Sequence, residues 1–354
     1  MTEIAIRDDA GAAQVLRDTT LTELAQAAID ASMPAGTRSK YEKWWRDFIA
    51  WCERTGRTPL PATAETIANY ITYLFSERVV EAGRSKGQTG LSLSTISQAR
   101  WAIAKAHELA EVELPSLKKS RKAIRGYKNA LAEAKDPRLR PQKAVAATAD
   151  ILQKLADAPQ APGLTGLRDR CMLLMWYSLG ARASEIITVN LEDVTEMPGG
   201  LLVALYRKKT DDDGEVAIPV QHASLTVEAF RAWRDALAGL GRTSGPLFVR
   251  LWRHCSWAPE DVVVQPAPGK APDSRLTIKG AEYVLKQAFQ RAGLGSDWSG
   301  HSMRRGFATA ARLAGHDNIT IAKQTGHQPG SPVLLGYMDD ADKWTRNALE
   351  GCGI

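Results

Sequence analysis

Residues 298–318, W-S-G-H-S-M-R-R-G-F-A-T-A-A-R-L-A-G-H-D-N, begin with residue types that bind phosphate. His301 and Arg304 are three positions apart, so a helix would place them on the same face. The first turn of a helix also has backbone N–H groups without intrahelical partners, and these attract anions. A histidine, an arginine and a helix N-terminus in one turn therefore predict a phosphate-binding site.

Three further short motifs contain ionisable or nucleophilic side chains. They are Arg182 and Glu185 in G-A-R-A-S-E-I, Lys208 and Lys209 in Y-R-K-K-T-D-D-D-G, and His327 and Tyr337 in T-G-H-Q-P-G-S-P-V-L-L-G-Y-M. Any one of these motifs is a weak signal, but five signals in a fixed order and spacing are specific.

The order G-x-R-x-x-E, a lysine on a β-hairpin, H-x-x-R, G-H and a tyrosine resembles the catalytic domain of the tyrosine recombinase (phage integrase) family. The segment W-S-G-H-S-x-R and the K-T turn most resemble the Cre-like branch of that family. The motifs extend over residues 180–340, and the helical region before them is similar to the family's core-binding domain.

The resemblance implies a reaction at a DNA phosphate. Tyr337 would attack the scissile phosphate to form a 3′-phosphotyrosine and a free 5′-hydroxyl, and a partner strand's hydroxyl would then reverse the bond. The energy of the broken bond stays in the phosphotyrosine, so ATP is not required. Because the sequence shows no carboxylate cluster of the kind that holds Mg²⁺, we expect no metal and no other cofactor.

The transition state of this reaction carries extra negative charge on the equatorial phosphate oxygens. Arg182 and Arg304 are always protonated and offer forked donors that match a phosphate. One positioned donor of this kind contributes about 3 kcal/mol. His327 is expected to add a further hydrogen bond to the phosphate.

Proton transfer and orientation complete the expected site. By resemblance to the family, Lys209 gives a proton to the departing 5′-oxygen, and its choice over Lys208 rests on the family's K-T pairing. His301 is expected to accept the tyrosine proton or to support the phosphate. Glu185 cannot usefully face a phosphate, so we expect it to orient His301 or Arg182 by hydrogen bonding.

Each of these residues also has an ordinary structural interpretation. The alternatives are an exposed i, i+3 ion pair of Arg182 with Glu185, solvated turn charges at Lys208 and Lys209, a helix cap at His301, a loop histidine at His327 and a packed aromatic at Tyr337. The chain also departs from the family pattern, since the spacing from His327 to Tyr337 is one residue longer than usual. The Cre-like branch can carry a tryptophan where His327 stands.

The hydrophobic patterning predicts mainly α structure with a small antiparallel β-sheet. Helices are expected near residues 21–28, 41–52, 67–75, 96–109, 151–156, 169–180, 227–240, 279–292, 301–313 and 318–325. Ser94 is expected to cap the helix at 96–109, and a shorter helix is expected near residue 124. Strands are expected at 201–206 and 215–220, and residues 259–272 read as a proline-rich loop. Tyr337 is expected in a flexible segment bracketed by glycines and prolines.

These elements predict two domains, as the length of 354 residues also suggests. We expect a disordered acidic lead-in at 1–19, a helical DNA-binding core-binding domain at 20–133, a linker at 134–143 and an α+β catalytic domain at 144–340. A C-terminal tail helix at 341–354 would, by resemblance, dock on a neighbouring protomer.

The charge is distributed unevenly, although the whole chain carries only +6 with a pI of about 9.1. Residues 1–30 hold six acidic and two basic residues, whereas residues 117–140 hold nine basic and two acidic ones. Beside a phosphate-transfer domain, basic residues at helix surfaces predict contacts to the DNA backbone. The candidates are Lys118, Lys119, Arg121, Lys122, Arg125, Arg275 and Lys279.

Other features favour a cytoplasmic protein, and the family resemblance implies one that is bacterial or phage-encoded and associated with the nucleoid. The four cysteines, Cys52, Cys171, Cys255 and Cys352, are far apart without a C-x-x-C pair, so reduced thiols are expected rather than zinc or disulfides. The N-terminus does not read as a signal peptide, and no apolar run is long enough to span a membrane.

The expected partners are double-stranded DNA with an inverted-repeat target site and, by family resemblance, a homotetramer on two sites that passes through a Holliday junction. No membrane partner is expected. Two other functions remain open at this stage. One is DNA relaxation by a type IB topoisomerase, which shares the chemistry, and the other is a catalytically inactive, architectural DNA-binding protein.

Overall fold

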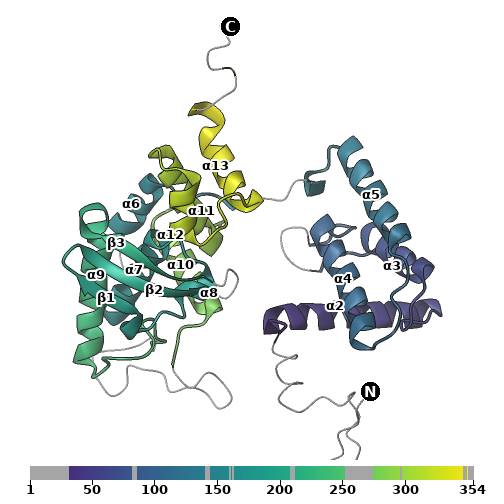
Figure 1. Cartoon of the computed structure of the whole chain (residues 1–354), viewed down its shortest axis with the longest axis horizontal. Coiled ribbons are helices and arrows are strands. Elements are labelled where there is room, and N and C mark those ends of the chain that lie inside the picture. The colour runs from purple at the N-terminus through teal and green to yellow at the C-terminus, as the bar shows by residue number, and fades with distance from the viewer. Residues whose placement is uncertain are drawn as a thin grey trace, which may run out of the picture. The chain divides into compact units, whose positions relative to one another are not determined.

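The computed structural model describes residues 32–81, 86–139, 144–158, 161, 163–207, 212–251, 274–295, 297–345 and 349. Its contacts divide the chain into two compact units between Gln142 and Lys143, a point inside the predicted linker (Figure 1). Several predictions lie outside the described residues: the acidic lead-in, the helix near 21–28, the proline-rich loop, the two turn lysines and most of the tail.

Unit 1 is helical. Its elements are α2 (Ala35–Thr55), α3 (Ala64–Ser76), α4 (Leu93–Leu109), α5 (Lys118–Glu133) and the short 3-10 helix η1 (Pro137–Leu139). Its core is aromatic: Phe48 and Tyr70 are fully buried with ring centroids 4.9 Å apart, and Trp51 packs beside them. The helices predicted at 41–52, 67–75 and 96–109 are confirmed, because their apolar residues recur at helical spacing and face this core.

Three boundaries in unit 1 differ from the prediction. The cap of α4 is Ser92 rather than Ser94, since Ser92 Oγ accepts the Thr95 N–H at 3.3 Å. Helix α5 is longer than predicted and spans 16 residues. Arg138 pairs with Asp136 and donates to Thr89 O at 2.6 Å, so residues 136–139 pack on unit 1 and leave a shorter linker.

Unit 2 combines helices with one small sheet (Figure 1). Its elements are α6 (Ala149–Asp157), α7 (Gly163–Ser178), α8 (Ala183–Ile186), η2 (Leu191–Asp193), β1 (Val194–Met197), β2 (Gly200–Arg207), β3 (Asp212–Pro219), α9 (Val220–Gly239), α10 (Ile278–Arg291), α11 (Gly300–Leu313), α12 (Asn318–Thr325) and α13 (Pro332–Thr345). The strands pair antiparallel in the order β1-β2-β3. The predicted hairpin is therefore confirmed, whereas β1, with four mostly exposed residues, has no alternating pattern that could have predicted it.

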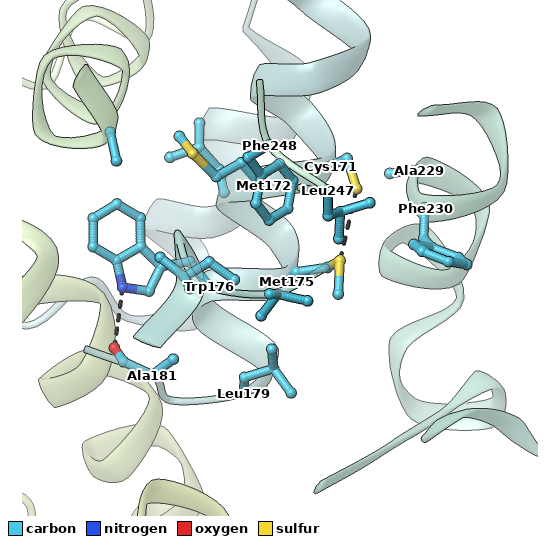
Figure 2. Close-up of a cluster of buried hydrophobic side chains, with 14 of the residues drawn as sticks. Cys171, Met172, Met175, Trp176, Leu179, Ala181, Ala229, Phe230, Leu247 and Phe248 are labelled. Atoms are coloured by element: carbon cyan, nitrogen blue, oxygen red, sulfur yellow. Dashed lines mark hydrogen bonds between the residues drawn. The ribbon is translucent and has the colours of Figure 1, made fainter. Parts of the chain in front are cut away.

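Helix α7 forms the centre of unit 2. Met172, Met175 and Trp176 on it are fully buried, and Figure 2 shows Met175 on the side of the α9 residue Phe230 and Trp176 on the opposite side, beside Ala181. The Trp176 indole N–H donates to Ala181 O at 3.0 Å, which fixes the turn that leaves α7. The apolar sequence of α7 predicted this burial.

Two glycines allow α11 to lie very close to its neighbours. A Cβ at Gly300 would be 2.3 Å from the Trp176 ring, and a Cβ at Gly306 would be 2.0 Å from Ala147 O. The Ala147 N–H also donates to Ser302 O at 3.0 Å, so the segment before α6 is hydrogen-bonded to the first turn of α11. In the described part of the chain, no helix has the length and apolar character needed to cross a membrane.

Replacing Gly306 should test this close contact. We expect Gly306→Ala to lower the free energy of unfolding by about 1–3 kcal/mol, because the backbone atoms of Ala147 cannot move away cheaply. Gly239→Ala is the control, since nothing lies within 4 Å of its added Cβ. Urea denaturation would measure both, and equal midpoints for the two variants would contradict the packing argument.

Candidate active site

The turn after α7 places the first candidate residues. Gly180 has a left-handed φ of +53°, and a Cβ there would lie 2.8 Å from the Thr325 methyl group. Arg182 then begins α8, and its backbone N–H donates to Glu185 Oε2 at 2.8 Å. The Arg182 guanidinium also forms an ion pair with Glu185. The predicted i, i+3 pair exists, but it is not an exposed one, since the Glu185 side chain is only 6% exposed.

Arg304, from α11, meets the same carboxylate. It is 1% exposed, and its Nη1 donates to Gly180 O at 2.7 Å and lies 3.8 Å from Glu185 Oε2. Arg182 and Arg304 therefore converge, although they are far apart in the sequence. Of the two roles expected for Glu185, the structure shows bonding to Arg182 rather than to His301, and adds an interaction with Arg304.

His327 lies on the turn after α12, where Gly326 ends the helix in a left-handed conformation. Its Nε2 is 3.0 Å from Arg304 Nη2, and its Nδ1 is 2.8 Å from Thr325 Oγ1. Burial and the adjacent Arg304, with smaller effects of Arg182 and Arg207, lower the pKa of His327 to about 3. The imidazole is therefore neutral at physiological pH.

Arg207 is a site residue that the sequence analysis did not select. It ends β2, is 2% exposed and donates to Lys323 O at 3.3 Å and Gln324 O at 2.8 Å. Its side chain lies so close to Gly326 that a Cβ there would be 2.5 Å from Arg207 Cδ. A charged residue at the end of an apolar strand, directly before the lysine turn, was the signal that could have revealed it.

Tyr337 lies on helix α13, so the prediction that it occupies a flexible segment is wrong. Pro329 and Gly330 precede the helix, Pro332 occupies its first position, where proline is tolerated, and Gly336 lies within it. Leu334 and Met338 then pack with α11 and α12, which holds the half-buried tyrosine beside them. The Tyr337 ring meets His327 edge-on with centroids 5.8 Å apart.

Arg305 supports the same tyrosine from α11. Its guanidinium lies over the Tyr337 ring, 5.7 Å from the centroid, and forms an ion pair with Asp340. Its Nη1 also donates to Ala144 O at 2.9 Å. Helix α13 continues past the predicted domain boundary at residue 340, and Arg312 pairs with Asp342 at 2.8 Å. Residues 341–345 therefore belong to unit 2 rather than to a separate tail.

The entrance of α11 differs from the predicted phosphate site. The Gly300 N–H donates to the Glu282 carboxylate at 3.0 Å, so the first N–H of the helix already binds an anionic group of the protein. His301 is exposed, unlike the buried Arg304, and it lies near enough to His327 to make a small contribution to the low pKa of that residue. The histidine thus borders the cluster, and the first N–H group of the helix is already used within the protein.

The remaining candidates fall into three groups. Lys208 and Lys209 lie outside the described residues. Arg275 donates to Ile187 O at 2.9 Å and to Asn190 Oδ1 at 2.6 Å, which favours a structural role in unit 2. The others are exposed on helices: Lys118, Lys119, Arg121, Lys122 and Arg125 on α5, and Lys279 on α10. Lys119 forms an ion pair with Glu65 on α3.

The cluster has an excess of positive charge. Arg182 and Arg304 share one carboxylate, Glu185. Arg207 adds a third positive charge near Arg304, and His327 is neutral. Burial, followed by repulsion from Arg182, lowers the pKa of Arg304 to about 10. A buried guanidinium that is destabilised by its neighbours is stabilised when an anion binds to it. This arrangement therefore favours binding of a phosphate beside Tyr337.

Residues 147–343 match the model of the phage integrase family. Curated relatives include an integrase/recombinase XerD homolog of Selenomonas ruminantium, which is 28% identical over 95% of this chain and 91% of its own length. Tyrosine recombinase XerD of Corynebacterium glutamicum is 26% identical over 89% of this chain and 90% of its own. These matches extend over both units.

Solved structures share the fold at low sequence identity. The integrase of transposon Tn1549, in complex with transposon right end DNA, is 14% identical with a TM-score of 0.56, covering 90% of this chain and 95% of that one. The XerH site-specific recombinase in a post-cleavage complex with palindromic difH substrate is 16% identical with a TM-score of 0.50, covering 82% and 70%.

The charge on Arg207 can be tested through His327. We expect Arg207→Met to raise the pKa of His327, because losing a nearby positive charge makes the protonated imidazole less unfavourable. An NMR titration of the histidine ring protons would measure it. Arg231→Met is the matched control, since Arg231 is exposed and pairs with Glu196. An unchanged pKa in a folded Arg207 variant would show that this guanidinium exerts no field on the imidazole.

Proposed function

The chain belongs to the phage integrase family of tyrosine recombinases, and from that premise we propose that it cuts and rejoins DNA through a covalent phosphotyrosine at Tyr337. One observation carries the proposal: Arg182 and Arg304, 122 positions apart, share the Glu185 carboxylate beside the tyrosine. A cluster of guanidinium groups next to a phenol suits nucleophilic attack on a phosphodiester.

In the proposed reaction the Tyr337 oxygen forms a bond to phosphorus while the bond from phosphorus to the 5′-oxygen breaks. The phenol proton leaves as the bond forms, and His301, at the border of the cluster, is the proposed acceptor. The departing oxygen takes up a proton, and resemblance to the family assigns this step to Lys209. The phosphodiester energy is kept in the new ester, so a second strand's hydroxyl can reverse the attack without ATP or metal.

The guanidinium groups act on the charge that develops during attack. Arg182, which is 20% exposed, is the more accessible of the two, and Arg304 has five N–H donors, of which two are hydrogen-bonded inside the protein. The remaining donors could bind the equatorial oxygens. Because Glu185 fixes the position of Arg182, the donors are preorganised before the substrate arrives.

DNA binding is proposed to involve both units. The five exposed basic residues of α5 would contact backbone phosphates, and exposed Lys279 in the first turn of α10 would do so from unit 2. The fold shared with an integrase bound to transposon end DNA supports a duplex as the substrate. Contacts of this kind bind DNA of any sequence and position it for cleavage.

We further propose that the chain acts as a homotetramer on two inverted-repeat sites, with a Holliday junction as the intermediate, in the bacterial cytoplasm. The palindromic substrate of XerH supports the inverted-repeat site, and the tetramer and the junction are proposed from the family resemblance. The C-terminal residues beyond α13 would dock on a neighbouring protomer, as the family resemblance suggests. The matched relatives are named as recombinases and integrases, which favours strand exchange over simple relaxation.

The nucleophile can be tested with a nicked suicide substrate, whose cleavage traps the covalent complex. We expect Tyr337→Phe to abolish the adduct seen on a denaturing gel and to leave DNA affinity unchanged, because only the attacking oxygen is lost. Tyr206→Phe, at an exposed position of β2, should form the adduct at the normal rate. An adduct that persists in the Tyr337 variant would refute the assignment. Relaxation of a plasmid without paired sites would favour a topoisomerase.

The phosphate contacts of α5 can be tested by the salt dependence of binding. We expect Lys122→Ala to weaken DNA binding to a similar extent for all sequences and to reduce the slope of log K against log salt by about one unit. Lys154→Ala, which removes an exposed charge from α6, is the control. Equal slopes for the two variants would argue against a phosphate contact at Lys122.

A further inference from the structure

Thr325 is a buried polar residue next to the cluster, and neither the motif pattern nor the proposed reaction gives it a role. It is fully buried in the last turn of α12, two positions before His327. Its hydroxyl makes two contacts, one with Ile321 O at 2.7 Å and one with His327 Nδ1 at 2.8 Å. Which group donates and which accepts in these two contacts determines which nitrogen of the imidazole carries the proton.

The carbonyl of Ile321 can only accept, so the single hydroxyl proton of Thr325 is donated to it. Thr325 Oγ1 must then accept from His327, which places the ring proton on Nδ1. In a neutral imidazole the other nitrogen, Nε2, carries a lone pair. Its partner at 3.0 Å is Arg304 Nη2, which can only donate, so all three contacts agree on this one tautomer.

The surroundings of His327 keep it in that neutral form. The positive groups that face it are Arg304 from α11, Arg182 at the start of α8 and Arg207 at the end of β2, and His301 from α11 is a further titratable group near it. The Tyr337 ring from α13 covers another side. Together with burial, these charges oppose a second proton on the ring.

We propose that Thr325 is a positioning residue of the active site, which holds His327 as the Nδ1–H tautomer so that Nε2 accepts from Arg304 and orients its guanidinium before DNA binds. The inference rests on the proposed function and deepens it. It differs from the expected role of His327 as a donor to the phosphate, because in the DNA-free site the nitrogen nearest Arg304 has no proton to donate. The guanidinium then has acceptors from two elements, Gly180 O and His327 Nε2.

The tautomer can be measured directly in the DNA-free full-length chain. The ¹⁵N chemical shifts of His327 should show a protonated Nδ1 and an unprotonated Nε2, and the Nδ1 proton should exchange slowly with water. Thr325→Val keeps the shape but removes the acceptor, so this proton should exchange faster, whereas Thr325→Ser should resemble the natural chain. A proton on Nε2 in the natural chain would overturn the proposal, whether or not the chain cleaves DNA.

Activity provides the second test. We expect Thr325→Val to slow adduct formation on the suicide substrate about tenfold, as for loss of one buried hydrogen bond, with unchanged DNA affinity. Thr325→Ser should keep nearly the full rate. Because Thr325 acts through His327, Thr325→Val should cause no further slowing in a chain that already carries His327→Leu.

The double variant separates the possible failures. Slowing by the same factor in both backgrounds would show that Thr325 supports the fold rather than the imidazole, and would overturn the proposal. If the natural chain forms no adduct at all, the proposed function fails, and the NMR measurement still decides whether Thr325 sets the tautomer.

Discussion

The candidate active site depends on one buried carboxylate that two guanidinium groups share. Glu185 accepts the backbone N–H and the side chain of Arg182, and its other oxygen faces Arg304. A buried carboxylate is costly to desolvate, and two cations compensate for that cost more fully than one. The arrangement therefore fixes both arginines at the position where a phosphate would need them.

The surrounding charges do not cancel, and this imbalance gives the site its chemical character. Arg207 adds a third guanidinium but uses its donors on the carbonyl groups that end α12. His327 avoids a further positive charge by staying neutral, and it acts as an acceptor toward Arg304. A site with this excess of cations is suited to bind an anion, and the half-buried phenol of Tyr337 lies next to it.

The scaffold brings these groups together by allowing unusually close backbone contacts. Gly180 turns the chain in a conformation that disfavours other residues and lets α12 approach. Gly306 and Gly326 make room for the Ala147 backbone and for the Arg207 side chain. Buried Trp176 at the centre links the core to the catalytic turn through Ala181 (Figure 2). Stability and site geometry thus depend on the same few residues.

Hydrophobic period and motif order are local properties of the chain, so the family, the two-unit organisation, most of the helices and the hairpin could be predicted from the sequence. The sequence also selected Arg182, Glu185, Arg304, His327 and Tyr337 as candidates, and the structure brings these residues together. Folding was needed to show that Glu185 joins the two arginines, that Glu282 occupies the start of α11, that Arg275 bonds within its own unit and that Tyr337 lies on a helix. Thr325 could not be selected in advance, since its role arises from an imidazole held beside it by folding. Arg207 had a local signal at the end of its strand, but the carbonyl groups that it binds come from a distant segment. Hydrogen-bond partners of this kind are set by distances between segments, and a linear sequence does not contain those distances.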